Sequence, residues 1–166
     1  MSSAWASFWT ALHPVFLWAH ASFPGVWVRN HGAAFPVVET FHLLALAMLF
    51  GSIVIVDLRL MGLMMKPQPV SQLASDLAPW TLGALAVMLG TGYLLFASEA
   101  DRCYDSQPFK IKMAFLFASI LFHFTAYRKV TRSEQVSGGT GWSMAFISLA
   151  LWFGVGLGGR AIGFLS

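Results

Sequence analysis

Ionisable side chains stand inside long apolar stretches of this sequence, and their spacing is the first indication of chemistry. Glu39 and His42 lie three residues apart, so on a helix they are neighbours on the surface. Lys112 and His123 stand eleven residues apart in KIKMAFLFASILFHF, close to three helical turns, so they project from one side. Ionisable groups at membrane depth usually face a bundle interior and pair with another group. We therefore expect these side chains, with Arg160, to face inward.

Depth along the helices divides these residues into two groups. We call side A the membrane face at which the first apolar stretch begins, and side B the opposite face. The order of the helices puts four residues near side A: Glu39, His42, Lys112 and Arg160. His123 lies about 16 Å further along, nearer Asp57, because each helical residue adds about 1.5 Å. We therefore predict that His42 and His123 belong to separate sites.

The residue types at side A suit a metal-centred cofactor. A neutral imidazole is a good ligand for haem iron or copper, so His42 is a candidate metal ligand, and His123 is a second. Glu39 could orient the imidazole, and Arg160 could neutralise a haem propionate. Lys112 could be a propionate partner or, once deprotonated, a ligand itself. A purely structural role is the alternative for each, such as a Lys112 ammonium that reaches the headgroups.

A copper site is an alternative near side B. The sequence MGLMM places Met61, Met64 and Met65 on adjacent turns near His123. Thioether sulfur suits Cu(I), although methionine is also an ordinary apolar residue.

Four apolar stretches must position these residues: 36–63, 77–98, 108–128 and 141–163. About 20 helical residues cross the hydrocarbon core of a bilayer. The chain is 57% hydrophobic and 10% charged, whereas soluble domains carry about 25% charged residues. Short polar linkers make consecutive helices antiparallel. The sequence thus predicts an all-α fold, an integral membrane four-helix up-down bundle with an N-terminal interfacial helix.

That interfacial helix is expected over residues 4–21, which are apolar but short and contain Pro14. A fifth span is the alternative, and a cleaved signal peptide is not indicated because no Lys or Arg precedes Arg29. We divide the chain into an interfacial segment, 1–35, and a transmembrane domain, 36–166. Basic residues outside the spans favour side B, so we predict that side B is cytoplasmic.

Other features carry less chemistry. The single cysteine, Cys103, excludes an internal disulfide and is expected to be inert. No basic run indicates nucleic acid. The GVGLGGR stretch follows no strand, so we interpret its glycines as sites of close helix packing.

Several stretches together resemble a known group of proteins: FPVVETFHLLALAMLFGSIVIVDLRLMGL, TGYLLF, FKIKM and LWFGVGLGGR. From about residue 25 onward they resemble an uncharacterised bacterial family of four-helix membrane proteins. That family looks distantly similar to the copper-resistance D proteins and to the four-helix membrane protoporphyrinogen oxidases. In these oxidases a histidine early in the first helix and a lysine early in the third are functional and linked to haem b, and His42 and Lys112 match these positions. The first helix here ends in DLRLMGL, where the oxidases have a proline–arginine pair followed by a histidine. The resemblance therefore implies the fold and the His42–Lys112 site more strongly than it implies the oxidase reaction.

We therefore expect a bacterial inner membrane protein that binds haem b or a related porphyrin, for electron transfer or porphyrin redox chemistry. A copper-handling protein and a structural or partner-binding subunit without a cofactor are the alternatives. Expected partners are membrane lipid and a porphyrin, a quinone, a periplasmic protein or a second copy of the chain. The residues do not define a reaction.

Overall fold

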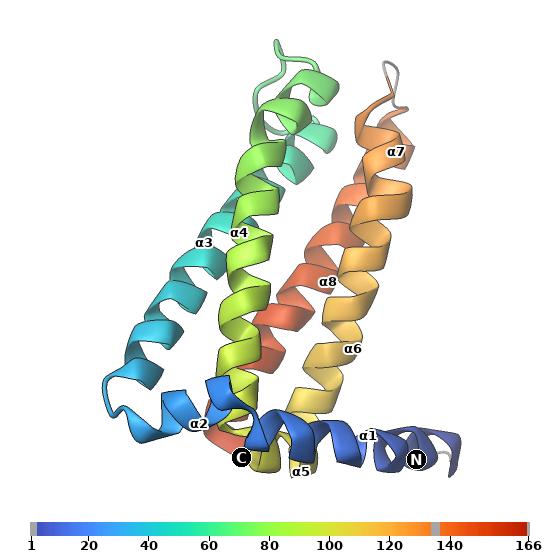
Figure 1. Cartoon of the computed structure of the whole chain (residues 1–166). Helices are drawn as coiled ribbons and strands as arrows, with labels where there is room; N and C mark the ends of the chain where they lie inside the picture. The colour runs from blue at the N-terminus through green and yellow to red at the C-terminus, as the bar shows by residue number, and fades with distance from the viewer. Residues whose placement is uncertain (1–2, 134–136, 166) are drawn as a thin grey trace.

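The computed structural model describes residues 3–133 and 137–165, and in that part all secondary structure is helical. Its helices include four candidate membrane spans. They are α3 (Ala34–Leu60), α4 (Val70–Ser98), the continuous run Gln107–Thr131 and α8 (Gly138–Leu165). Figure 1 shows these spans side by side, running alternately up and down. The all-α fold and the membrane-spanning bundle that we predicted are confirmed.

The outward faces of these helices are apolar. The side chains of Phe117 and Leu157 are 72% and 67% exposed. Such exposure would be unfavourable in water, and it is what a helix surrounded by lipid requires.

The third span is not one regular α-helix. It consists of α6 (Gln107–Phe122), the π-helix η1 (His123–Tyr127) and the short α7 (Arg128–Thr131). The helix begins where the Ser106 hydroxyl accepts a hydrogen bond from the Phe109 amide, 3.3 Å away. No pattern of residues predicts η1, and short π-helical turns are frequent at functional sites.

Most span boundaries differ from the prediction by one to three residues, and the start of the second span differs by seven. The second span begins at Val70 rather than residue 77, because Pro69 adopts an extended conformation (ψ 139°) and the polar VSQ forms the first turn. The first span ends at Leu60, since Gly62 takes a positive φ of 72° that terminates the helix.

The spans pack as two pairs. Helix α3 packs on α4, α6 packs on α8, and contacts between α3 and α8 join the pairs. The central core between them contains Leu49, Ile53, Leu85, Met88 and Trp152. A Cβ atom at Gly154 of α8 would overlap the Phe115 ring of α6. This contact agrees with our interpretation of the GVGLGGR glycines as packing positions.

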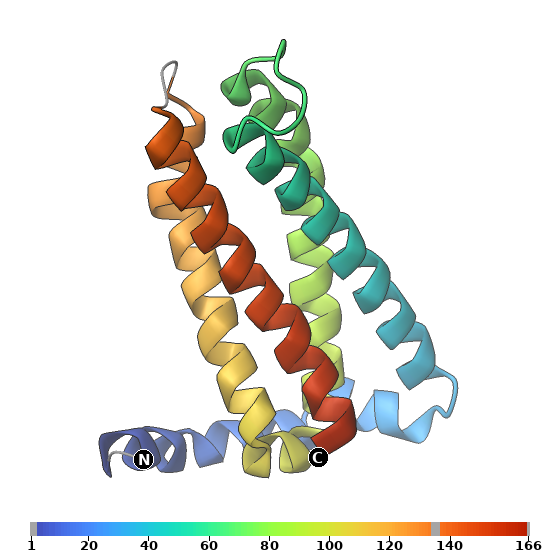
Figure 2. The same ribbon diagram turned by 180° about the vertical axis from the view of Figure 1, so that it is seen from behind.

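Two N-terminal helices, α1 (Ser3–Ala21) and α2 (Phe23–Asn30), lie across the side A end of the bundle (Figures 1 and 2). Helix α1 packs through Trp9 and Phe16 against Cys103 and Phe109. Cys103 belongs to the short helix α5 (Ala100–Asp105), which links α4 to α6. The described part of α1 thus has the orientation expected of an interfacial helix.

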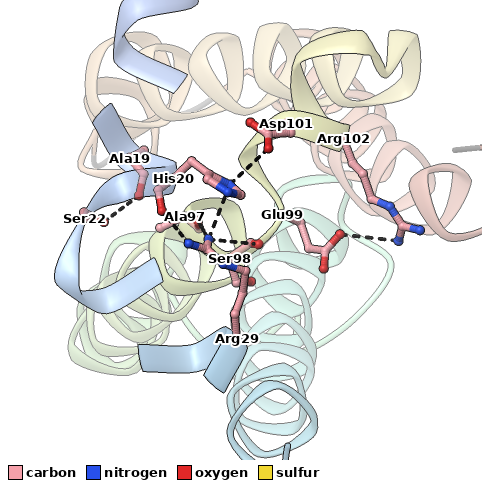
Figure 3. Close-up of polar contacts among 9 residues, drawn as sticks. All are labelled: Ala19, His20, Ser22, Arg29, Ala97, Ser98, Glu99, Asp101 and Arg102. Atoms are coloured by element: carbon pink, nitrogen blue, oxygen red, sulfur yellow. Dashed lines mark hydrogen bonds and ion pairs between the residues drawn. The ribbon is translucent and has the colours of Figure 1, made fainter. Parts of the chain in front are cut away.

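Arg29 ties α2 to the ends of two other helices (Figure 3). Its Nη1 donates to the Ala97 carbonyl at 3.1 Å, and its Nη2 donates to the His20 carbonyl at 2.7 Å. These carbonyls lie at the C-terminal ends of α4 and α1, where backbone acceptors lack helical partners. A Cβ at Gly25 would come within 2.6 Å of the Ala97 oxygen, so only glycine lets α2 approach α4 this closely. The contact fixes the end of α4 that carries Thr91 and Gly92.

Candidate functional site

His42 occupies a cradle made by α4. Its Nδ1 lies 2.9 Å from the Thr91 hydroxyl oxygen. That hydroxyl donates its only proton to the Val87 carbonyl, 2.6 Å away. The Thr91 oxygen can therefore only accept from the ring, so the proton of neutral His42 is on Nδ1. The other nitrogen, Nε2, then carries an unshared electron pair, which is the form of histidine that binds a metal.

The residue next to Thr91 completes the cradle. A Cβ at Gly92 would lie 3.2 Å from Cε1 of His42, closer than most side chains approach. The Met88 carbonyl also faces the ring from the preceding turn of α4. The TGYLLF stretch thus contributes an acceptor at Thr91 and space at Gly92, both directed to His42.

Lys112 of α6 lies against the glycines of α8. A Cβ at Gly158 would come within 2.9 Å of the Lys112 Cβ, and one at Gly159 would lie 3.6 Å from Nζ. The side chain is half-buried, and its ammonium is within electrostatic reach of the His42 ring. Among the described residues it donates no hydrogen bond. The structure thus brings His42 and Lys112 to one level near side A.

The other two residues expected at side A are at the surface. Glu39 is exposed on α3 and forms no ion pair with any residue that the structure describes. Arg160 is exposed near the end of α8. A spacing of three residues turns the helix by about 300°, which leaves Glu39 about 60° away from His42 and toward the outside. Glu39 and Arg160 thus lie at the side A end of the bundle with exposed side chains, so the expectation that they face inward is wrong.

Cys103, also near side A, is buried in α5. Burial raises the pKa of its thiol to about 11, and the nearby Lys112 ammonium opposes that rise. The thiol therefore stays protonated at neutral pH, which fits the inert role expected of it.

A second polar cluster lies near side B. Asp57 of α3 is completely buried, and the hydroxyls of Tyr127 and Ser148 face its carboxylate. Neither hydroxyl is close and aligned enough for a well-formed hydrogen bond. The His123 ring stacks on Tyr127, with centroids 5.2 Å apart. Asp57 and His123 therefore share one cluster, away from His42.

Tyr127 and Ser148 were not predicted from the sequence. Tyr127 follows His123 by four residues, which is a usable signal, whereas Ser148 stands alone in an apolar helix. Of the three methionines of the copper alternative, Met64 and Met65 are exposed and Met61 is half-buried. No group of three His, Cys, Asp or Glu side chains that could hold a metal occurs in the described part of the chain.

The fold and these clusters define a class of protein: a multi-pass helical membrane protein with ionisable side chains held at two depths in one bundle. The chain belongs to a family of unknown function, DUF6644, whose model matches residues 15–165. No curated protein and no solved structure matches it.

Proposed function

We propose that this protein binds haem b or a related porphyrin near side A, with His42 as the iron ligand. One observation carries the proposal: His42 Nδ1 lies 2.9 Å from the Thr91 hydroxyl, whose proton is directed to the Val87 carbonyl, an arrangement that favours donation from Nδ1 and leaves Nε2 with its electron pair. Histidine ligands of metals are commonly held in this way, through a hydrogen bond from the ring nitrogen that does not bind the metal.

The surrounding residues suit the same ligand. The Lys112 ammonium, without a hydrogen bond to any described residue, is available to a propionate or, after losing its proton, to the iron. Glu39 and Arg160 stand at the same end, where an exposed cation could meet a second propionate. Bound there, a haem would supply one-electron transfer within the membrane. The chain's own contribution is to hold the His42 ring and to place a cation beside it.

The resemblance to the four-helix protoporphyrinogen oxidases supports this assignment, because His42 and Lys112 match the functional histidine and lysine there. It also supports a bacterial inner membrane location. The DLRLMGL end of the first helix differs from the proline–arginine pair and histidine of the oxidases. For this reason we propose porphyrin binding or electron transfer and not the oxidase reaction itself.

The proposal is tested by the haem content of variants expressed with ample haem precursor. His42→Ala should abolish the haem absorbance while the protein still inserts, and His31→Ala, an exposed histidine of the N-terminal region, should not. Lys112→Ala should weaken or shift the absorbance. Lys112→Met should do so less if Lys112 is an iron ligand that sulfur replaces. Haem retained in full by His42→Ala would refute the assignment, and copper lost from that variant would favour the copper alternative.

A further inference from the structure

A cavity of about 280 Å³ opens near side B, far from His42. Its walls come from α3, from the first turns of α4 and from the η1–α7 end of the third span. The volume is near the lower limit of pockets that hold small ligands. Its lining includes His123 and Tyr127, and Tyr127 also lies beside Asp57.

The charge of this cavity has one sign. Arg128 and Arg132 line it, and no acidic residue of the described chain does. Neither guanidinium makes an ion pair or a side-chain hydrogen bond with a described residue, although Arg128 is within electrostatic reach of His123. Two exposed cations with no counter-charge among the described residues, beside this partly open space, favour an anionic ligand.

The N-terminal end of α4 adds to this preference. Ser71 of its first turn lines the cavity. The N-cap residue, Pro69, gives the helix no side-chain cap, and the first turn contains no acidic residue. The amides of such a turn carry a partial positive charge that an anion can satisfy.

The apolar lining residues suit a different chemical group. They include Ile53, Val56, Ala78 and Leu82, which offer only apolar contact. The hydroxyls of Ser52 and Thr81 donate to the carbonyls of Met48 and Leu77 in their own helices. Ser52 and Thr81 therefore offer no free proton to an anionic head, and an apolar chain suits this part of the cavity.

The position of the cavity identifies the source of such a ligand. Arg128 and Arg132 stand at the end of the third span, and Ser71 stands at the start of the second, so both are at the level of the lipid headgroups. We propose that this cavity binds an anionic membrane phospholipid, with its phosphate at Arg128 and Arg132 and part of an acyl chain between α4 and η1. Basic pockets between spans on a cytoplasmic face bind such lipids. This site does not depend on whether His42 holds a haem.

The test is native mass spectrometry of the full-length protein in detergent, with dioleoyl phosphatidylglycerol, dioleoyl phosphatidylcholine or oleate added. We expect phosphatidylglycerol to be retained in preference to phosphatidylcholine. Arg128→Gln with Arg132→Gln should weaken its binding about thirtyfold, from about fivefold for each cation. The matched control is Lys66→Gln with Lys129→Gln, which removes two exposed side B cations that do not line the cavity.

A third variant separates the cavity from surface charge. Ala78→Phe fills the apolar end and leaves both arginines in place, so it should also reduce phosphatidylglycerol binding. An equal loss in the lysine control would show surface attraction only and would overturn the proposal. So would equal retention of the two phospholipids, or binding of oleate alone.

Discussion

Thr91→Val is the substitution that most directly probes how α4 prepares His42. Valine keeps the shape of threonine but removes the oxygen that accepts from His42 Nδ1 at 2.9 Å. The ring would then lose the partner that keeps its proton on Nδ1 and its electron pair on Nε2. We therefore expect weaker haem binding by a protein whose fold is unchanged.

The size of this effect follows from the geometry. Losing such a partner of a ligating histidine typically lowers metal affinity 10- to 100-fold, equivalent to about 1.4–2.8 kcal/mol. The His42 ring is only half-buried, and the Met88 carbonyl faces it as a substitute acceptor. These two features place the expected loss at the lower end, about tenfold.

The assay is titration of haem into the haem-free protein in detergent, followed by absorbance. Thr91→Ser retains the hydroxyl and should bind as the unchanged protein does. Thr40→Val is the matched control, because the exposed Thr40 hydroxyl donates only to the Pro36 carbonyl of its own helix. An unchanged affinity in Thr91→Val, or an equal loss in Thr40→Val, would refute the role assigned to the Thr91 hydroxyl.

Three further predictions concern the frame around the site. Gly158→Ala should lower the free energy of unfolding in detergent by about 1–3 kcal/mol, because the new Cβ would lie 2.9 Å from that of Lys112. Gly156→Ala should not, because a Cβ there has no neighbouring atom within 4 Å, and equal effects of the two substitutions would contradict this packing. Cys103 should react with maleimide slowly at neutral pH and faster as the pH rises toward 11, since burial keeps its thiol protonated; fast labelling of the folded protein at pH 7 would show that the thiol is not enclosed. In a Cys103→Ser background, maleimide should label Ser7→Cys and Asn30→Cys from one membrane face and Lys66→Cys from the other. Labelling of Ser7→Cys and Asn30→Cys from opposite faces would show instead that the N-terminal region contains a membrane span.

The sequence was a good guide to the helices because their apolar length is set by the bilayer itself. Helical period likewise put Lys112 and His123 on one side, since eleven residues return to within about 20° of the starting direction. The separation of His42 from the Asp57–His123 cluster followed from rise per residue alone.

The partners of these residues could not be predicted in the same way. Thr91, Gly92 and Ser148 act across helix interfaces, and their own helices show no polar spacing that marks them. The start of α4 at Val70 was missed because polar residues in a first turn look like a linker. The π-helix at His123–Tyr127 was also not predicted, because its residues show no local pattern that distinguishes it from an α-helix.

The absorption spectrum of the purified protein, expressed with ample haem precursor, tests the central claim most directly. The account predicts a haem Soret band that His42→Ala eliminates and that His123→Ala leaves in place, because the two histidines belong to separate clusters. A protein without a chromophore under these conditions would contradict haem binding. A band lost equally in both variants would contradict the assignment of His42 and Lys112 to a site of their own.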